Sequence, residues 1–184
     1  MSDFTDACHV LDAIDARQGL PEEVFLTVSV LVPIANVDLM VIDEQKRILL
    51  SWRDDVYYGK GWHLPGGCIR FKETMLERLQ KTALDEIGMK VAVSGPPLAI
   101  RDVILGKESA IPKLRAHHLA VLYECHLPAG FVADNKDRDE HTAGYLRWFN
   151  KIPTNILSVH EVYFDVFERY GLMDKENIAF IGAC

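Results

Sequence analysis

Hydrophobic positions between residues 74 and 88 recur at spacings of three and four, which is typical of a helix with one apolar face. The members of this stripe are Leu76, Leu79, Ala83 and Ile87. Thr74 stands three residues before Glu77, the spacing of a capping box, and Gly88 supplies a C-terminal stop. The pattern therefore predicts a helix from Thr74 to Gly88 that packs on a sheet. The charged residues expected on its opposite side are Arg78, Lys81 and Asp85.

Shorter runs rich in β-branched and aromatic residues predict strands on both sides of this helix. They span residues 35–42, 47–53, 90–93, 98–105, 115–126 and 145–149, and the polar turn 43–46 is expected to join the first two in a hairpin. Further helices are predicted at residues 4–17, from Pro21 to just before Pro33, and at 158–170, where Ser158 and Glu161 again have capping-box spacing. The sequence thus predicts an α/β fold with a mixed sheet between helices.

Composition fits one globular domain and narrows the class of partner. The chain has 184 residues, of which 49% are hydrophobic, and a formal net charge of −7, which suits a single core of ordinary size. No apolar run reaches the roughly 18 residues that span a bilayer, and the acidic N-terminus lacks a signal-peptide pattern, so we expect a cytoplasmic protein with no membrane partner. A nucleic-acid partner is not expected either, because lysine and arginine do not cluster.

Carboxylates at the end of the predicted 74–88 helix are candidates for holding a hard cation. Asp85 and Glu86 oppose the helix dipole at a C-terminus, and a bound cation would compensate this cost. The run Pro65-Gly66-Gly67 before the helix permits a sharp turn that exposes backbone carbonyl oxygens. The four cysteines, at positions 8, 68, 125 and 184, lack CxxC spacing, so we expect reduced thiols and no zinc site.

The segment from Gly66 to Gly88 resembles the Nudix box. That pattern is Gly, five residues, Glu, seven residues, Arg-Glu, an apolar residue, any residue, Glu-Glu, any residue, Gly and an apolar residue. The residues that match outright are Gly67, Glu73, Glu86, Gly88 and Met89, and those that match conservatively are Lys81 and Asp85. Thr82 does not match, and in most of the family the glutamate at that position helps to bind the metal that activates pyrophosphate cleavage.

The resemblance extends beyond this box. Roughly residues 20–167 are similar to the GDP-mannose mannosyl hydrolase branch of the Nudix superfamily. The segments that carry it are LPEEVFLTVSVLVPIANVD, ILLSWR, GWHLPGG, HHLAVLY, the DEH…Y…RW run from Asp139 to Trp148, and SVHEVYF. This resemblance implies a Nudix-type α/β/α sandwich at residues 20–184, preceded by an N-terminal helical extension at 1–19. It also suggests a homodimer.

The same resemblance implies roles for individual residues. The carbonyl of Gly66 and the carboxylate of Glu86 would bind Mg²⁺, with Mn²⁺ as a possible substitute, and Asp85 would bind it directly or through water. Arg53 matches an arginine that acts on the nucleotide diphosphate, and a planar guanidinium suits phosphate oxygens in two-point contact. The remaining matches are Asp38 in substrate binding, His118 in catalysis and Tyr145 in both.

One departure from this branch concerns the general base. The mannosyl hydrolases resemble DEQH where this chain has Asp139-Glu140-His141-Thr142, and the family's histidine is the base. Threonine cannot accept a proton near neutral pH, whereas imidazole can, so His141 is the expected base. Cys68 also replaces an arginine that follows the two glycines in that branch.

These observations predict a Mg²⁺-dependent hydrolase of a nucleoside diphosphate sugar, with GDP-mannose or GDP-glucose the first candidates. Water would attack the anomeric carbon and release GDP and free sugar. Two alternatives stay open. One is an ordinary Nudix pyrophosphohydrolase, in which water attacks phosphorus, and the other is a nucleotide-sugar-binding Nudix domain without catalysis. The absence of a glutamate at Thr82 favours attack at carbon.

Overall fold

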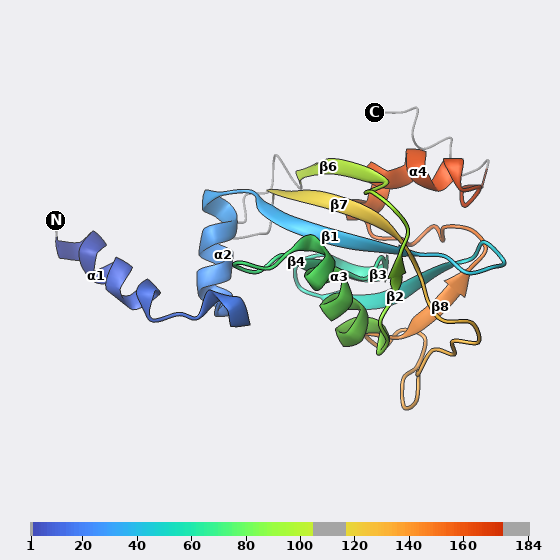
Figure 1. Ribbon diagram of the computed structural model, residues 1–184, viewed down its shortest axis with the longest axis horizontal. Coiled ribbons are helices and arrows are strands. Elements are labelled where there is room, and N and C mark those ends of the chain that lie inside the picture. Colours follow the sequence, from blue (N-terminus) through green and yellow to red (C-terminus); the bar gives the residue numbers. More distant parts are fainter. Residues whose placement is uncertain (1, 105–116, 175–184) are drawn as a thin grey trace.

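Two sheets lie side by side at the centre of the computed structural model, which describes residues 2–104 and 117–174 (Figure 1). The five-stranded sheet has the order β4 (Gly66–Cys68), β1 (Ile34–Val41), β7 (His117–His126), β5 (Ala92–Val93), and β6 (Ala99–Ile104) also pairs with β7. Only β1 and β7 are parallel, so this sheet is mixed. The second sheet is antiparallel, with the order β3 (Gly59–His63), β2 (Ile48–Asp55), β8 (Leu146–Phe149).

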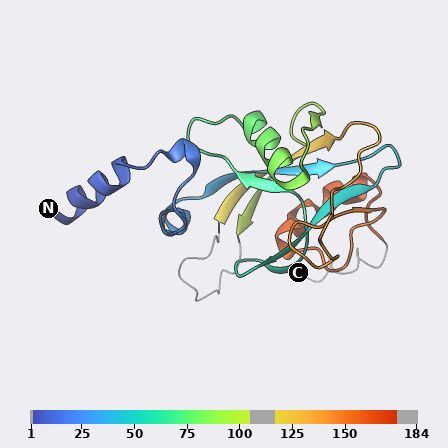
Figure 2. The ribbon, with the colours of Figure 1, turned by 90° about the horizontal axis from the view of Figure 1, so that it is seen from below.

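Helices cover the sheets and extend the N-terminus. Their bounds are α1 (Ser2–Asp12), the 3₁₀ turn η1 (Ala16–Gln18), α2 (Glu22–Leu31), α3 (Met75–Thr82) with its π-helical continuation η2 (Ala83–Ile87), and the 3₁₀ turn η3 (Ser158–Tyr163) that leads into α4 (Phe164–Arg169). In two perpendicular views α1 projects away from the sheets, whereas α2 lies at the end of the strands, beside the start of β1 (Figures 1 and 2). No helix in the described ranges is both long enough and apolar enough to cross a bilayer.

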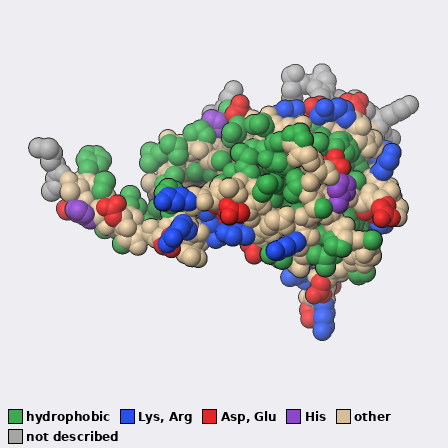
Figure 3. Space-filling view, in the orientation of Figure 1, with side chains coloured by type: hydrophobic (Ala, Val, Ile, Leu, Met, Phe, Trp, Pro, Cys, Tyr) green, Lys and Arg blue, Asp and Glu red, His purple; other side chains and the backbone are tan. Residues whose placement is uncertain are grey.

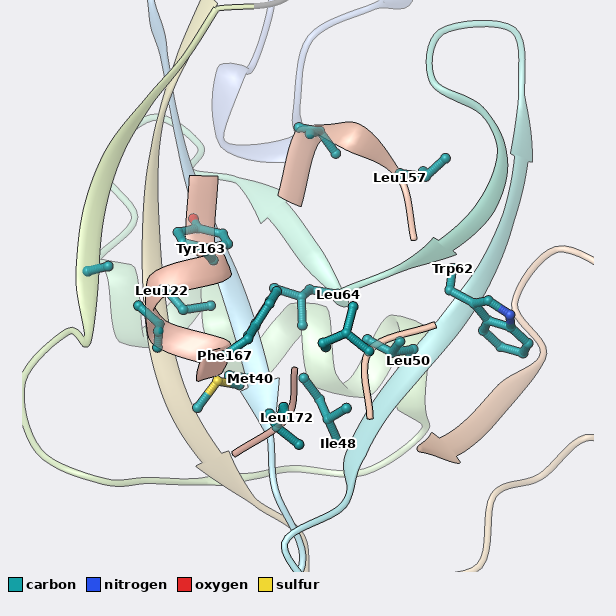
Figure 4. Packing of buried hydrophobic residues seen from close by; sticks show 14 of the residues in the cluster. Met40, Ile48, Leu50, Trp62, Leu64, Leu122, Leu157, Tyr163, Phe167 and Leu172 are labelled. Carbon is teal, nitrogen blue, oxygen red and sulfur yellow. The ribbon is translucent and has the colours of Figure 1, made fainter. Parts of the chain in front are cut away.

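Strand alternation divides the core into two clusters. On β1, Val37, Leu39 and Val41 face α3 and pack with its buried residues. Met40, on the opposite face, packs among side chains of the second sheet, η3 and α4, as Figure 4 shows. The residues from these elements that are fully buried with Met40 include Ile48, Leu50, Tyr163 and Phe167. The five-stranded sheet is therefore covered on both faces.

The fold confirms the expected α/β class, and the helix at 74–88 is confirmed with its capping box. Two details of that helix were wrong: Leu76 is exposed, and Arg78 is buried because it pairs with Glu73. The expected Ser158 cap was also wrong, because Leu157 is the N-cap of η3 and no side chain caps it.

The predicted hairpin of residues 35–42 and 47–53 was wrong. A single bridge between Ile42 and Ile48 joins the two segments. Both edges of β1 are already paired, with β4 and β7, so β2 leaves for the second sheet. The short strands β3 and β4 were not predicted.

A cluster of charges fixes the connection from β4 to α3. Glu73 accepts hydrogen bonds from the Nε of Arg78 at 2.7 Å and the backbone N–H of Arg70 at 3.0 Å, and Lys81 lies 2.8 Å away. The Glu73 and Arg78 side chains are only 5% and 6% exposed. Burial alone would raise the pKa of Glu73, but the bonds from Arg78, Lys81 and Arg70 outweigh it and lower the pKa to about 2.

We predict that Glu73→Gln lowers the free energy of unfolding by about 3 kcal/mol near neutral pH. A carboxylate whose pKa is lower in the folded state stabilises the fold above its unfolded pKa, and this stabilisation disappears as the pH falls through the folded pKa. The difference from wild type should therefore shrink between about pH 4.5 and pH 2. Denaturant unfolding at a series of pH values measures it.

The matched control is Glu44→Gln, at an exposed glutamate with no hydrogen bond or ion pair in the described structure. It should leave stability unchanged at every pH. A Glu73→Gln variant as stable as wild type at pH 7 would show that the cluster does not hold the connection.

Candidate functional site

A cleft opens where the two sheets meet, and its walls come from widely separated parts of the chain. It has a volume of about 80 Å³, and α2 and η3 cover it from the sides. The polar side chains at its walls include those of Asp38, Arg53, His63, His118 and His160, and the backbone of Gly66 also lines it. The fold thus collects side chains and backbone from β1, β2, β3, β4, β7 and η3 around one small space.

Asp38 is a buried carboxylate on β1 whose oxygens are both hydrogen-bonded. Tyr163 donates its hydroxyl to Oδ2 at 2.7 Å, and Asn36 donates Nδ2–H to Oδ1 at 2.8 Å. Burial raises the pKa of Asp38 to about 6, against the opposing effects of these two bonds and of the charge of Arg53. A carboxyl held in this way can accept a hydrogen bond from a ligand hydroxyl at the cleft.

Gly66 and Gly67 allow two close approaches of β4 to its neighbours. A β-carbon at Gly66 would lie 2.4 Å from Asp38 Oδ1, and one at Gly67 would lie 2.6 Å from Thr82 Oγ1. Neither glycine has a positive φ, so the expected sharp turn at Pro-Gly-Gly was wrong, and both residues belong to a strand. They are glycines because Asp38 occupies the side-chain space on one face and α3 on the other.

Glu86 lies at the C-terminal end of the helix, next to the open edge of β4. The backbone N–H of Gly66 donates to its Oε1 at 3.2 Å. Because the β1–β4 ladder bonds Leu39 to Pro65, Gly66 and Asp38 form a non-bonded pair, and the N–H and C=O of Gly66 point away from β1. The carbonyl of Gly66 therefore faces the same edge as Glu86.

Electrostatics around Glu86 favour a cation. The pKa of Glu86 is raised to about 7, chiefly by burial and with smaller contributions from the nearby Asp38 and Asp85, against the opposing effects of the Gly66 N–H and the charge of Arg53. A cation at this carboxylate would relieve the repulsion among the three acids. Asp85 itself is exposed.

The donor set fits magnesium better than a transition metal. In the described ranges, no three His, Cys, Asp or Glu side chains are arranged to hold a metal. Mg²⁺ does not need such a cluster, because it is usually bound by one or two carboxylates and keeps water or substrate phosphate in its other positions. Glu86 and the Gly66 carbonyl can supply two oxygens. Thr82, in the position of the missing glutamate, is buried beneath Gly67 and its hydroxyl has no hydrogen-bond partner.

Arg53 enters the cleft from β2. Its Nε pairs with Asp55 Oδ2, and its guanidinium lies over the ring of Tyr58, 4.7 Å from the centroid. The side chain is 30% exposed, so it is partly desolvated and still accessible. A guanidinium in this place can contact an anionic group of a ligand.

His63 and His160, which were given no role from the sequence, also line the cleft, as does His117. His63 Nδ1 lies 2.7 Å from the carbonyl of Leu64, and His160 Nε2 accepts the N–H of Leu64 at 3.1 Å. A carbonyl only accepts, so His63 carries its proton on Nδ1 and its Nε2, 3.8 Å from Glu86 Oε2, is unprotonated. Burial, with a smaller effect of Arg53, lowers the pKa of His63 to about 4. His63 and His160 lie in segments that carry the family resemblance, GWHLPGG and SVHEVYF.

The structure brings together most, but not all, of the residues expected from sequence. Asp38, Arg53, Gly66 and His118 line the cleft, and Glu86 joins them through Gly66. Tyr145 packs beside the core, with its ring 6.3 Å from that of Trp62.

His141 does not line the cleft. It is exposed and rests on Trp52, with 4.5 Å between the ring centroids. Because neighbouring side chains of a strand point to opposite faces, Trp52 and His141 lie on the side of β2 away from Arg53. The assignment of His141 as base stays a prediction.

Comparisons with known proteins show the fold. No family model matches the chain, and no curated protein matches its sequence. Among solved structures, the MutT protein of Methanosarcina mazei Go1 is similar, with a TM-score of 0.55 and 17% identity over 76% of this chain and 94% of that one.

Two further structures are similar over most of their length. A MutT Nudix hydrolase of Burkholderia pseudomallei has a TM-score of 0.55 and 20% identity, over 73% of this chain and 97% of its own. A possible asymmetric diadenosine tetraphosphate hydrolase of Jonesia denitrificans has a TM-score of 0.57 and 15% identity, over 79% and 99%. The chain therefore has the Nudix fold, as the sequence predicted.

We predict that Gly67→Ala destabilises the protein by about 1–3 kcal/mol, because its methyl group would overlap the hydroxyl of Thr82. In a Thr82→Ala background, which removes that hydroxyl, the same substitution should cost less than half as much. A double-mutant cycle from denaturant unfolding measures the coupling. Equal costs in both backgrounds would show that this contact does not set the approach of α3 to β4.

Proposed function

We propose that the protein is a Mg²⁺-dependent hydrolase of a nucleoside diphosphate sugar, with GDP-mannose or GDP-glucose as first candidates and Mn²⁺ as a substitute cation. The observation that carries the proposal is the placement of Asp38 and Arg53 in one cleft, with Glu86 beside it and hydrogen-bonded to the cleft residue Gly66. This arrangement combines an acceptor for hydroxyl groups, a cationic contact for phosphate and an oxygen ligand for a metal ion. The Nudix fold supports it, because similar structures with this fold are described as hydrolases of the Nudix class.

In the proposed reaction, the oxygen of a water molecule forms a bond to the anomeric carbon of the sugar. The bond between that carbon and the phosphate oxygen breaks, and its electron pair leaves with GDP. The water proton passes to a base on the protein. A bound divalent cation would neutralise charge on the diphosphate. Arg53 would contact the same diphosphate, and Asp38 would orient a sugar hydroxyl beside it.

Attack at carbon is favoured over attack at phosphorus by the environment of Thr82. Pyrophosphate cleavage in most of the family uses a metal-binding glutamate at this position, and here a small hydroxyl is enclosed between α3 and Gly67. The protein therefore offers few side-chain ligands near Glu86. Pyrophosphate cleavage is the second candidate, and two similar structures favour it. One is the possible diadenosine tetraphosphate hydrolase described above, and the other, with a TM-score of 0.51, is a UDP-X diphosphatase.

His63 is the base that the geometry favours. Its unprotonated Nε2 lies in the cleft beside Glu86, and its Nδ1–H is fixed by the carbonyl of Leu64. The pKa of about 4 keeps His63 unprotonated at neutral pH, so its Nε2 can accept a proton from water without a change of tautomer, although the same low pKa makes it a weaker base than an ordinary histidine. His141 could serve only if its loop moved around β2, since it now packs on Trp52.

The proposed function predicts, first, that the purified protein with Mg²⁺ converts GDP-mannose or GDP-glucose to GDP and free sugar. In ¹⁸O-labelled water the label should appear in the sugar, whereas label in GMP or a sugar phosphate would establish attack at phosphorus. Glu86→Gln should lower kcat by about 100-fold, because it removes a charged metal ligand. Cys68→Ala should retain turnover. If no nucleotide sugar of a panel is hydrolysed, the proposed reaction is contradicted and the alternative of a nucleotide-sugar-binding domain without catalysis is supported.

The second prediction separates the two histidines. His63→Gln should lower kcat by about 100-fold with little change in KM, because general base catalysis contributes about 10² to 10⁴ in rate. His141→Ala should lower kcat by less than about threefold. The reverse pattern would return the base role to His141. Thermal unfolding of both variants checks that the fold is intact.

A further inference from the structure

A second cavity adjoins the cleft and is much larger. Its volume is about 550 Å³, and it lies between the N-terminal segment, η1 and α2, and the connection from β4 to α3. The two cavities share the wall residues Phe25, Ile34, Gly67 and Cys68. The two cavities meet at these residues, and together they are called the groove. Small-molecule sites commonly occupy about 300–1,000 Å³, so the larger part can hold a group that the cleft cannot.

One extended segment forms the floor of this groove. The pairing of β4 with β1 continues past Cys68, because Ile69 donates its N–H to Ala35. Alternate residues share a face, so Gly66, Cys68 and Arg70 follow one another along the floor. Four residues of extended chain span about 13 Å. The edge where Glu86 lies is at one end of this floor, and the guanidinium of Arg70 is at the other.

Arg70 is a half-buried arginine without a protein partner. Within residues 2–104 and 117–174 its guanidinium has no hydrogen bond or ion pair, whereas all other arginines there are paired with carboxylates or carbonyls. It packs against Gly19, where a β-carbon would lie 3.4 Å from Arg70 Nε. Lysine and arginine side chains gather over this part of the surface, where α2 meets the β4–α3 connection (Figure 3). An unpaired guanidinium here suits a phosphate group.

Aromatic and aliphatic side chains line the rest of the larger cavity. Phe25, Tyr57 and Phe71 are the aromatic members, and Leu20 and Leu26 are among the aliphatic ones. Tyr57 also donates its hydroxyl to Glu22, which ties the turn between β2 and β3 to α2 across the groove. Aromatic faces beside a free cation are the combination that binds a base and its phosphate.

We propose that the larger cavity is the nucleotide subsite, in which the base packs against Phe25 and its aromatic neighbours and Arg70 binds the phosphate next to the ribose. The diphosphate then runs along the floor toward Arg53 and Glu86, and the sugar enters the cleft beside Asp38. This inference deepens the function proposed above and rests on it. It gives α2 and η1 a direct part in substrate recognition.

The test is GDP binding to the full-length protein with Mg²⁺, measured by isothermal titration calorimetry. Arg70→Ala should weaken binding about tenfold or more, because a charge-assisted contact is lost, and Arg70→Lys should recover part of it. Phe25→Ala should also weaken binding. Arg17→Ala is the matched control: this arginine lies on η1, outside the cavity, and pairs with Asp15. Its affinity for GDP should equal that of wild type.

No binding of GDP by wild type, or Arg70→Ala and Arg17→Ala with the same affinity as wild type, would overturn the inference. Because binding is measured without turnover, its result is separate from that of the hydrolysis assay. Loss of GDP affinity in Arg70→Ala, together with failure to hydrolyse any nucleotide sugar, would support the subsite and contradict the proposed reaction. Hydrolysis of a nucleotide sugar, together with a GDP affinity that does not change in Arg70→Ala, would support the proposed reaction and contradict the subsite.

Discussion

One face of β4 is covered by the side chain of Asp38, which comes from the neighbouring strand β1, and the other face is covered by α3. Both contacts require that β4 has no side chain at Gly66 and Gly67. At Gly66 the space for a β-carbon is occupied by the carboxylate of Asp38, and at Gly67 by the hydroxyl of Thr82. These approaches set the distance of α3 from the sheet, and so they set where Glu86 lies relative to Asp38. The position of Glu86 on the helix relative to Asp38 on β1 is therefore set by the absence of side chains at Gly66 and Gly67.

This constraint places like charges together, and the surrounding groups make the arrangement tolerable. Asp38 is stabilised by Tyr163 and Asn36, Glu86 by the N–H of Gly66, and both by the charge of Arg53. The pKa of each carboxyl nevertheless stays raised, because burial dominates. A cation that binds between these carboxylates removes part of their repulsion and so lowers the free energy of the site. The same repulsion therefore raises the affinity of the site for a cation. The structural cluster at Glu73 differs, since its charges are already balanced within the protein.

Features with a local cause could be predicted from the sequence. The 74–88 helix was predicted because its caps and apolar period lie within one segment. Gly66 and Gly67 were expected to form a sharp turn, but they lie in a strand, and the need for glycine there comes from the close approach of Asp38 and Thr82, which only the fold brings together. β3 and β4 were missed because they are short and rich in glycine. His63 and His160 were given no role because only the fold brings them together: both hydrogen-bond to the backbone of Leu64, which lies 96 positions before His160.

The most direct test of the account is where a paramagnetic cation binds. Mn²⁺ added in small amounts to ¹⁵N-labelled protein broadens the amide signals of residues close to its site, and Mg²⁺ should reverse the effect by competition. The account predicts that the signals of Gly66, Gly67 and Glu86 broaden first and that those of His141 and its loop stay sharp. Broadening centred on residues 139–142, or sharp signals at Gly66 and Glu86, would contradict it.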